Sequence, residues 1–253
     1  MTQELLSIVT PVYNAENYIL ETIQMVLNQT YQNWELLLVN DASTDRSSQV
    51  IEDYLEKNPD SRIHLIQQEH NSGAAAARNR GIAEAKGRYL AYLDADDIWL
   101  PEKMEKELAF MEEKQAAFVC CSYEFGDENA KGTGRIVHVL PELTYRKALS
   151  RTIIFTTTVV FDLTRLTKEQ ITMPLVKSED TASWWSILRQ GYTAYGLDEV
   201  LAIYRRPKKS LSSNKFEAMK RIWNLYRRQE HLNVFQSAWY FCFWAWRATM
   251  RRI

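Results

Sequence analysis

Short apolar runs alternate with amphipathic segments over the first 110 residues of the chain. Four of the runs span four to six residues and end at turn residues, which predicts buried strands. These four runs are Leu5–Thr10, Trp34–Val39, Ile63–Ile66 and Tyr89–Leu93. The segments between them repeat apolar residues at helical spacing, and Pro101 begins a further helix. Asn14 is placed to cap the first of these helices.

Strands that alternate with helices form βαβ units, which place the strands parallel in one sheet. We therefore expect an α/β fold with a mainly parallel, Rossmann-like central sheet flanked by helices. After residue 115 the alternation stops, and Glu179–Arg189 is the next clear helical pattern. The strands expected in this second part are Phe118–Phe125, Ile136–Leu140 and Phe155–Phe161. We expect one domain at residues 1–212, made of two halves, 1–115 and 116–212. C-terminal helices follow at 213–253.

Acidic residues follow two of the predicted strands, where ligands bind in parallel sheets. Asp41 follows the second strand, and Asp94, Asp96 and Asp97 follow the fourth in the sequence YLDADD. Carboxylates this close repel one another unless a donor or a cation neutralises them, and Mg²⁺ is held by such carboxylates together with phosphate oxygens. The alternative is a solvated acidic turn in which Asp97 caps the next helix. Asp41 could likewise accept a hydrogen bond from an N–H of a nucleotide base or from a ribose hydroxyl. The alternative is that it forms an Asx turn.

Two further segments carry candidate chemistry. Gly73 stands near a helix start with Arg78 one turn later, and the N–H groups of a helix N-terminus favour anions. The G-x-G-x-x-G pattern of dinucleotide-dependent dehydrogenases is absent there. Glu179 and Asp180 begin another helix, where carboxylates commonly compensate the helix dipole. They could instead supply a general base near an acceptor hydroxyl, with Trp184 and Trp185 as a stacking wall for a sugar.

The charge of the chain is unevenly distributed. The 253 residues carry a net charge of −1, but the part from Tyr204 onward carries +10 and the rest −11. A basic tail favours contact with an anionic surface. Val234–Trp246 is apolar over only about 13 residues, too short to span a bilayer, and its Trp and Tyr side chains favour the headgroup region. The alternatives are a dimer interface in a homo-oligomer or packing on the main domain; nucleic acid is disfavoured because no known binding motif is present.

Cysteine usage and the N-terminus bear on the compartment. Cys120, Cys121 and Cys242 lack metal-like spacing, and so low a count favours a reducing compartment. No signal peptide and no apolar run of about 18 residues is recognised. We expect a cytoplasmic protein associated peripherally with the inner face of the cell membrane.

Six segments in this order resemble one family, the inverting glycosyltransferases of family 2 with the GT-A fold. Within that family, the chain is similar to bacterial enzymes of surface-polysaccharide synthesis, of the teichuronic-acid type. The segments are SIVTPVYN (Ser7–Asn14), VNDASTD (Val39–Asp45), NSGAAAARNRG (Asn71–Gly81), YLDADD (Tyr92–Asp97), SED (Ser178–Asp180) and YRRPKKSLS (Tyr204–Ser212).

The resemblance implies a nucleotide-sugar donor, most often a UDP-sugar, bound in the first half, and an acceptor bound in the second. The donor is expected to contact Thr10, Pro11, Tyr13, Asp41, Gly73, Arg78, Asp94 and Ala95. Asp94 and Asp96 would form a DXD motif, with Asp96 toward Mn²⁺ or Mg²⁺. Asp180 would be the catalytic base, and Glu179 beside it would position the acceptor or the base. The acceptor would be a lipid-linked or glycan hydroxyl.

The last segment departs from the family pattern. Pro207 occupies the place where members often have a histidine that helps to hold the metal or diphosphate. Lys208 and Lys209 follow it, and could take over part of the diphosphate charge or contact membrane or solvent. Two other functions remain open: a nucleotidyltransferase, although no Gly-rich loop follows the first strand, and a non-catalytic nucleotide-binding scaffold.

Overall fold

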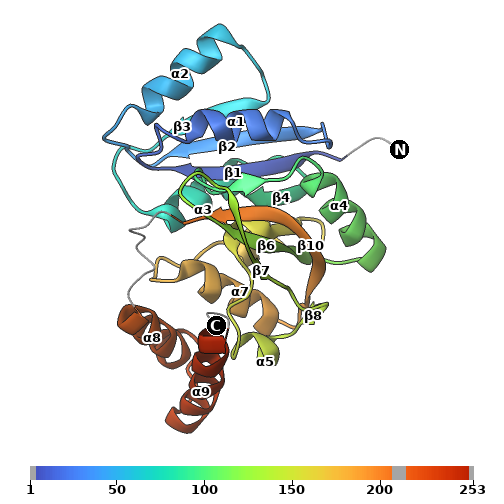
Figure 1. The fold of residues 1–253 in the computed structure, drawn as a ribbon, viewed down its shortest axis with the longest axis vertical. Coiled ribbons are helices and arrows are strands. Elements are labelled where there is room, and N and C mark those ends of the chain that lie inside the picture. Colours follow the sequence, from blue (N-terminus) through green and yellow to red (C-terminus); the bar gives the residue numbers. More distant parts are fainter. Residues whose placement is uncertain (1–3, 207–214, 251–253) are drawn as a thin grey trace.

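The computed structural model describes residues 4–206 and 215–250 of the chain, folded as one mixed sheet with helices on both faces (Figure 1). The strands are β1 Leu6–Val12, β2 Trp34–Asn40, β3 Ile63–Gln67, β4 Tyr89–Tyr92, β5 Ile98–Trp99, β6 Phe118–Gly126, β7 Gly132–Val137, β8 Glu142–Leu143, β9 Val159–Asp162 and β10 Ala194–Arg205. The helices are α1 Ile19–Leu27, α2 Ser47–Lys57, α3 Ala74–Glu84, α4 Lys103–Lys114, α5 Tyr145–Ala148, α6 Lys168–Ile171, α7 Glu179–Arg189, α8 Lys215–Asn224 and α9 Val234–Met250.

The first half of the sheet confirms the predicted βαβ units. Strands β3, β2, β1 and β4 lie side by side in that order and all pair parallel. Each carries branched or aromatic side chains into the interior, and α1, α2 and α3 connect them. The carboxyl ends of β1, β2 and β4 therefore meet at one edge, as expected for a ligand site.

The prediction of a mainly parallel sheet is wrong for the second half. Strand β9 inserts between β4 and β6 and runs antiparallel to both. Strands β5, β7 and β8 also pair antiparallel, and only β10 pairs parallel with β6. The chain between β6 and β9 contains β7, β8 and the short helix α5 instead of the long crossover helix of a βαβ unit, so the alternation that imposes parallel pairing is lost here. The sheet is therefore mixed.

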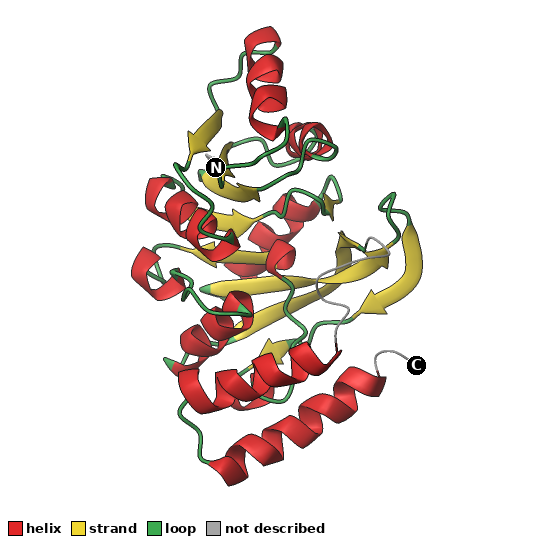
Figure 2. Cartoon of the chain, turned by 90° about the vertical axis from the view of Figure 1, so that its left-hand side faces the viewer, coloured by secondary structure: helices red, strands yellow, loops and turns green. Residues whose placement is uncertain are grey.

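Two helix layers enclose the sheet (Figure 2). On one face, α3 packs closely on β1, because a Cβ atom on Gly81 would lie 2.3 Å from Val9 Cγ1. On the same face, Trp184 of α7 packs on Phe118 of β6, with ring centroids 5.5 Å apart. Helix α4 covers the other face. These layers bury the apolar side of each helix in one continuous core.

Helix α4 carries an ion pair into the core. The side chains of Lys103 and Glu107 are fully buried and contact each other, and the Lys103 ammonium lies 4.3 Å from the ring centroid of Trp99. Burial raises the pKa of Glu107, and the charge of Lys103 offsets part of that rise. Each charge thus depends on the other for compensation.

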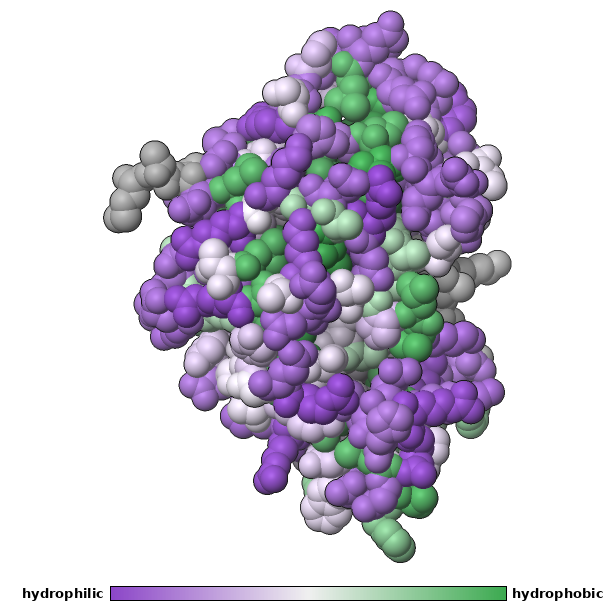
Figure 3. Space-filling view, turned by 180° about the vertical axis from the view of Figure 1, so that it is seen from behind, coloured by the Kyte–Doolittle hydropathy of each residue, from purple (hydrophilic) through white to green (hydrophobic). Residues whose placement is uncertain are grey.

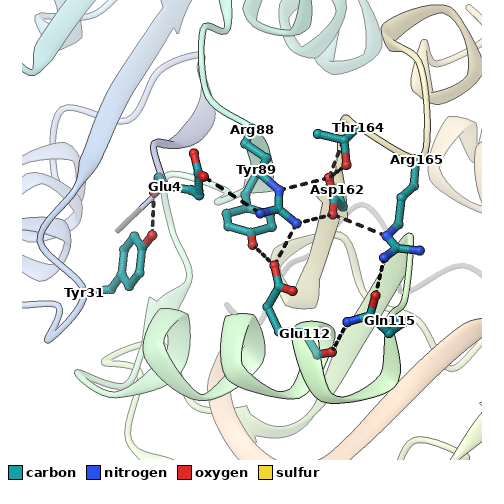
Figure 4. A network of polar contacts seen from close by, with 9 residues as sticks. All are labelled: Glu4, Tyr31, Arg88, Tyr89, Glu112, Gln115, Asp162, Thr164 and Arg165. Carbon is teal, nitrogen blue, oxygen red and sulfur yellow. Dashed lines mark hydrogen bonds and ion pairs between the residues drawn. The ribbon is translucent and has the colours of Figure 1, made fainter. Parts of the chain in front are cut away.

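A polar cluster centred on Arg88 fastens the opposite end of the sheet, away from the carboxyl ends of the parallel strands (Figure 4). The guanidinium lies 3.0 Å from Asp162 of β9 and 2.7 Å from Glu112 of α4. Burial opposes ionisation of Asp162, but its hydrogen bond from Arg88 prevails and lowers its pKa. The cluster ties β4, β9 and α4 together and is structural.

The C-terminal segment forms the predicted helix pair, which lies at the lower end of the molecule in Figure 1. A π-helical segment, Leu225–Gln229, follows α8, and its Tyr226 stacks on Trp185 of α7 at 5.1 Å between ring centroids. Arg189 lies 2.9 Å from Glu230, just beyond that segment. The pair therefore packs on the second half of the main domain. No helix in the described ranges is long and apolar enough to cross a bilayer.

Candidate active site

A cavity of about 520 Å³ opens at the carboxyl ends of β1, β2 and β4. The sequence-predicted residues that line it are Pro11, Tyr13, Asp41, Gly73, Arg78, Asp94, Ala95 and Asp96. Segments far apart in the chain thus converge on one space large enough for a small ligand.

Thr10, one of the expected donor contacts, does not line this cavity. Thr10 is fully buried within β1, and its hydroxyl faces the interior rather than the cavity. Strand geometry explains this, because successive side chains point to opposite faces of the sheet. The expectation for its side chain is therefore wrong. Lys208 and Lys209 lie outside the described residues, as does Pro207.

Asp41 fixes the loop that leads into α3. Its Oδ1 accepts hydrogen bonds from Gln68 Nε2 at 2.7 Å and from the Ser72 N–H at 2.8 Å, and its Oδ2 accepts from the Gly73 N–H at 2.7 Å. An ionised carboxylate offers about four acceptor positions. Three are occupied by the protein itself, so one remains for a ligand donor.

Gly73 supplies a backbone conformation that the loop requires. Its φ of +88° and ψ of 164° lie in a region that is essentially restricted to glycine. This geometry turns the chain so that α3 begins at Ala74 with its N-terminus at the cavity. The free N–H groups of such a terminus favour an anionic ligand.

Arg78 joins the two acidic segments of the chain. Its Nη2 lies 2.6 Å from Asp94 Oδ1, and its Nη1 lies 3.2 Å from Glu179 Oε1. The side chain is 5% exposed. Burial by itself lowers the pKa of this guanidinium, but the surrounding carboxylates outweigh that effect and raise it. Arg78 is therefore a permanent cation that lies between the acids after β4 and the acids at the start of α7.

The acids after β4 repel one another in a partly buried setting. Burial, and then the charge of Asp94, raise the pKa of Asp96. Burial and both neighbouring carboxylates raise the pKa of Asp97 still further. Asp97 does not cap α4 but accepts a hydrogen bond from the Arg205 N–H at 3.2 Å.

Arg205 holds this acidic loop in place. It was not among the site residues predicted from the sequence. Its Nε donates to the Asp96 carbonyl at 2.7 Å, and its Nη2 is paired with Glu21 of α1. The guanidinium also lies 4.8 Å from the ring centroid of Tyr18. Its place in YRRP, at the end of β10, was the available signal. The residue fixes the main chain between Asp96 and Asp97.

Glu179 and Asp180 occupy the first turn of α7. Ser178 precedes them with φ of +61°, a left-handed conformation that is uncommon for serine. Burial, and then the charge of Glu179, raise the pKa of Asp180, whose Oδ1 accepts from the Thr181 N–H at 2.6 Å. Neither acid lines the cavity directly. Glu179 is joined to it through Arg78.

A second contact holds this region against α3. The Asn79 amide donates to the Met173 carbonyl at 2.8 Å and accepts from the Met173 N–H at 2.7 Å. This two-way pairing fixes the segment that leads into Ser178. Adjacent residues of one helix therefore hold both the acids of the first half and the approach to α7.

Trp184 and Trp185 do not form the expected stacking wall. Their side chains are 3% and 1% exposed. Trp184 packs on Tyr92 and Phe118 in the core, and Trp185 stacks on Tyr226. The two indoles face inward because α7 buries its apolar side against the sheet and the C-terminal helices, so the prediction that they contact an acceptor is wrong.

The sequence also missed three polar residues that line the cavity: Asn14, Tyr18 and Asn71. Asn14 does not cap α1, whose N-cap is Tyr18. It adopts φ of +52°, and its Oδ1 accepts from the Thr44 N–H at 2.9 Å, which joins the loops after β1 and β2. Its position directly after a strand was the available signal.

The residues around Asp96 suit a divalent cation that is shared with a ligand. Asp94 and Asp96 line one cavity, and their mutual repulsion would be relieved by a cation. Among the described residues, no three His, Cys, Asp or Glu side chains converge as a complete metal site. The protein thus offers two carboxylates, and phosphate oxygens of a ligand would complete the coordination, as Mg²⁺ commonly requires.

Comparisons with known proteins show the family to which the chain belongs. The sequence pattern described as glycosyl transferase family 2 matches residues 7–172. The chain is 41% identical over 250 residues to a protein of Bacillus subtilis (strain 168) named as a teichuronic acid biosynthesis glycosyltransferase, TuaG, with 98% of each covered. It is 38% identical over 226 residues to the Escherichia coli UDP-Glc:alpha-D-GlcNAc-diphosphoundecaprenol beta-1,3-glucosyltransferase WfgD, covering 89% of this chain and 86% of that protein.

Solved structures share the fold. The mannosyltransferase PcManGT of Pyrobaculum calidifontis, in complex with GDP-Man and Mn²⁺, superposes with a TM-score of 0.71 at 17% identity, covering 96% of this chain and 74% of that one. S. aureus TarS 1–349 in complex with UDP-GlcNAc gives 0.69 at 21% identity, covering 95% and 71%. The family pattern and the relatives together identify the chain as a glycosyltransferase that belongs to family 2.

Proposed function

We propose that this glycosyltransferase moves a sugar from a UDP-sugar to a hydroxyl of a lipid-linked acceptor in the synthesis of a bacterial surface polysaccharide. The observation that carries the proposal is the bridge from Asp94 through Arg78 to Glu179, because it joins a cavity suited to a nucleotide with a helix suited to a base. The names of TuaG, WfgD and the TarS complex support the substrate classes.

The donor occupies the cavity in this proposal. Tyr13 and Asp41 contact the nucleoside, and the N-terminus of α3 faces the diphosphate. Asp94 and Asp96 would hold a divalent cation, Mn²⁺ or Mg²⁺, which would supply positive charge beside the diphosphate. Arg78, ionised at all working pH values, adds a fixed positive charge beside the same group.

Asp180 acts as the general base. Its carboxylate takes the proton from the acceptor hydroxyl while that oxygen forms a bond to the anomeric carbon. The bond from that carbon to the diphosphate breaks, and the nucleoside diphosphate leaves with the electron pair from the opposite face, which inverts the configuration. The raised pKa of Asp180 suits this role, since a base is most effective when its pKa approaches the working pH.

The base is tested by Asp180→Asn in the full chain, with Asp198→Asn, an exposed carboxylate, as the matched control. UDP release and glycan transfer are measured with UDP-glucose, Mn²⁺ and a lipid-linked N-acetylglucosaminyl diphosphate. Asp180→Asn is expected to lose turnover by about 10³-fold or more while UDP affinity is unchanged. Removal of Mn²⁺ with EDTA is expected to weaken UDP binding in both variants. Retained turnover in Asp180→Asn rejects the assignment of the base.

The C-terminal helices support a peripheral position at the inner face of the membrane. Apolar and aromatic side chains on α9 remain exposed although the helix packs on the domain. The most exposed are Val234, Phe235, Trp239 and Trp246, with exposed fractions of 55%, 87%, 64% and 60%. Apolar surface reaches the lower end of the molecule among polar residues in Figure 3. Aromatic side chains beside basic ones favour the headgroup layer.

Membrane binding is tested by co-sedimentation with phosphatidylglycerol vesicles. Phe235→Ser/Trp239→Ser is expected to reduce the bound fraction severalfold, because both rings would leave the interface. Leu20→Ser on α1, also an exposed apolar residue, is the control and is expected to bind as the wild type does. Equal binding of all three proteins contradicts the proposed membrane contact.

A further inference from the structure

A second cavity, of about 450 Å³, lies between α8 and the segment that leads into α7. Four cationic side chains line it, Lys177, Lys220, Arg221 and Arg228, together with the single carboxylate of Glu217. None of its lining residues belongs to the cavity assigned to the donor. It is therefore a separate, strongly basic site.

The four cations are available to a ligand. Within the described part of the chain, none of them forms an ion pair with a carboxylate, unlike Arg78, Arg88 and Arg205. Because no carboxylate of the described residues is paired with them, these charges would attract an anion into the cavity.

The cavity lies beside the proposed base. Lys177 precedes Asp180 by three residues, a length of chain that reaches at most about 11 Å. The other side is fixed as well, because Ile222 and Leu225 are buried and Tyr226 stacks on Trp185 of α7. An anionic group in the cavity would thus lie at a set distance from the first turn of α7.

We propose that this cavity binds the diphosphate group of the lipid-linked acceptor, an inference that rests on the proposed function. A diphosphate has the charge and the multiple oxygens that neighbouring arginines and lysines recognise. The sugar attached to it would then extend toward Asp180. Its lipid chain would leave along α8, where Phe216 and Met219 are 83% and 40% exposed.

The test uses the full chain and a short-chain alkyl diphosphate of N-acetylglucosamine as the probe. Lys220→Gln/Arg228→Gln changes two polar side chains at the rim of the cavity and is expected to retain the fold; Arg221→Gln is measured separately. Each is expected to weaken calorimetric binding of the probe, and to raise its KM, by about tenfold. Arg80→Gln, which removes an exposed arginine on α3, is the control and is expected to match the wild type. Unchanged probe affinity in both pocket variants overturns the proposal.

Two further measurements distinguish failure of the pocket from failure of the proposed function and from lipid binding. UDP release from UDP-glucose in the absence of acceptor is expected to be equal in wild type and pocket variants. Its absence from the wild type, with probe binding retained, would count against the proposed function and not against the pocket. Binding to phosphatidylglycerol vesicles, measured without the probe, tests whether the cavity binds lipid headgroups instead of the acceptor diphosphate. If the pocket variants lose vesicle binding but keep probe affinity, the cavity serves membrane phosphates and the proposal is wrong.

Discussion

Asp94 and Glu179 contact the two terminal nitrogens of one guanidinium, that of Arg78, at 2.6 and 3.2 Å. One acid follows a strand of the first half and the other begins a helix of the second. Their common partner is 5% exposed, so little water screens the interaction. The position of α7 relative to the cavity at the ends of β1, β2 and β4 therefore depends on one side chain.

Replacement of that side chain is expected to affect folding and catalysis together. Arg78→Gln leaves several partly buried carboxylates without their cation, which is expected to cost about 3–5 kcal/mol of unfolding free energy. Turnover is expected to fall by about 100-fold or more, because α7 would lose its link to the cavity. Urea denaturation and UDP release measure the two effects. Arg80→Gln, on the exposed side of the same helix, is expected to change stability by less than about 1 kcal/mol. Equal effects of the two replacements would refute a special role for Arg78.

The acidic limb of the pH–rate profile is expected to respond to Glu179. Because the charge of Glu179 contributes to the raised pKa of Asp180, Glu179→Gln lowers that pKa. The base then stays ionised to lower pH, so the limb moves to lower pH, by roughly half a pH unit. The profile of kcat/KM measures this shift. Glu199→Gln, an exposed carboxylate, is expected to leave the limb in place. A limb that moves to higher pH contradicts the proposed coupling.

Gly73→Ala is expected to weaken donor binding. At φ of +88° a Cβ atom strains the loop by about 1–3 kcal/mol, which displaces the start of α3. Calorimetry with UDP and Mn²⁺ measures the loss of affinity. Gly134→Ala is a matched control, since Gly134 also has positive φ, of +79°, and open space at its Cβ but lies in β7. It is expected to lower stability without changing UDP affinity; equal losses of affinity would assign the Gly73 effect to general destabilisation.

The buried pair in α4 is expected to show strong coupling. Lys103→Met leaves Glu107 buried without its cation and is expected to cost about 3–5 kcal/mol, measured by urea denaturation. Lys103→Met/Glu107→Leu removes both charges and is expected to recover most of that loss. The single variant Glu107→Leu completes the comparison. If the double variant loses as much stability as Lys103→Met and Glu107→Leu lose together, the pair does not interact.

The first half of the fold could be predicted because its strands and helices alternate, and helical crossovers dictate parallel pairing. The direction of β9 could not, since a short apolar run is compatible with either orientation. Acidic residues after strands indicated the cavity, as Asp41 and Asp96 show. The pattern also placed Trp184 near Asp180, but helical spacing alone did not reveal that the indole faces the core.

Other parts of the site depend on contacts between distant segments. Arg205, at the end of β10, supports the acidic loop after β4, and its place in YRRP does not by itself reveal that contact. Asp41 was expected to contact a ligand, yet its carboxylate accepts three hydrogen bonds from the loop before α3. Sequence patterns located the carboxylates, but only the tertiary structure shows which of them hold loops in place and which face the cavity.

The stack of Trp185 on Tyr226 fixes the position of α7 relative to the C-terminal helices. A bilayer that holds the exposed rings of α9 would also set the height of Asp180 above the lipid surface. The enzyme would then select acceptors whose reacting hydroxyl lies at that distance from the lipid surface. The length of the sugar chain between lipid and hydroxyl would be a determinant of specificity, independent of the identity of the sugars.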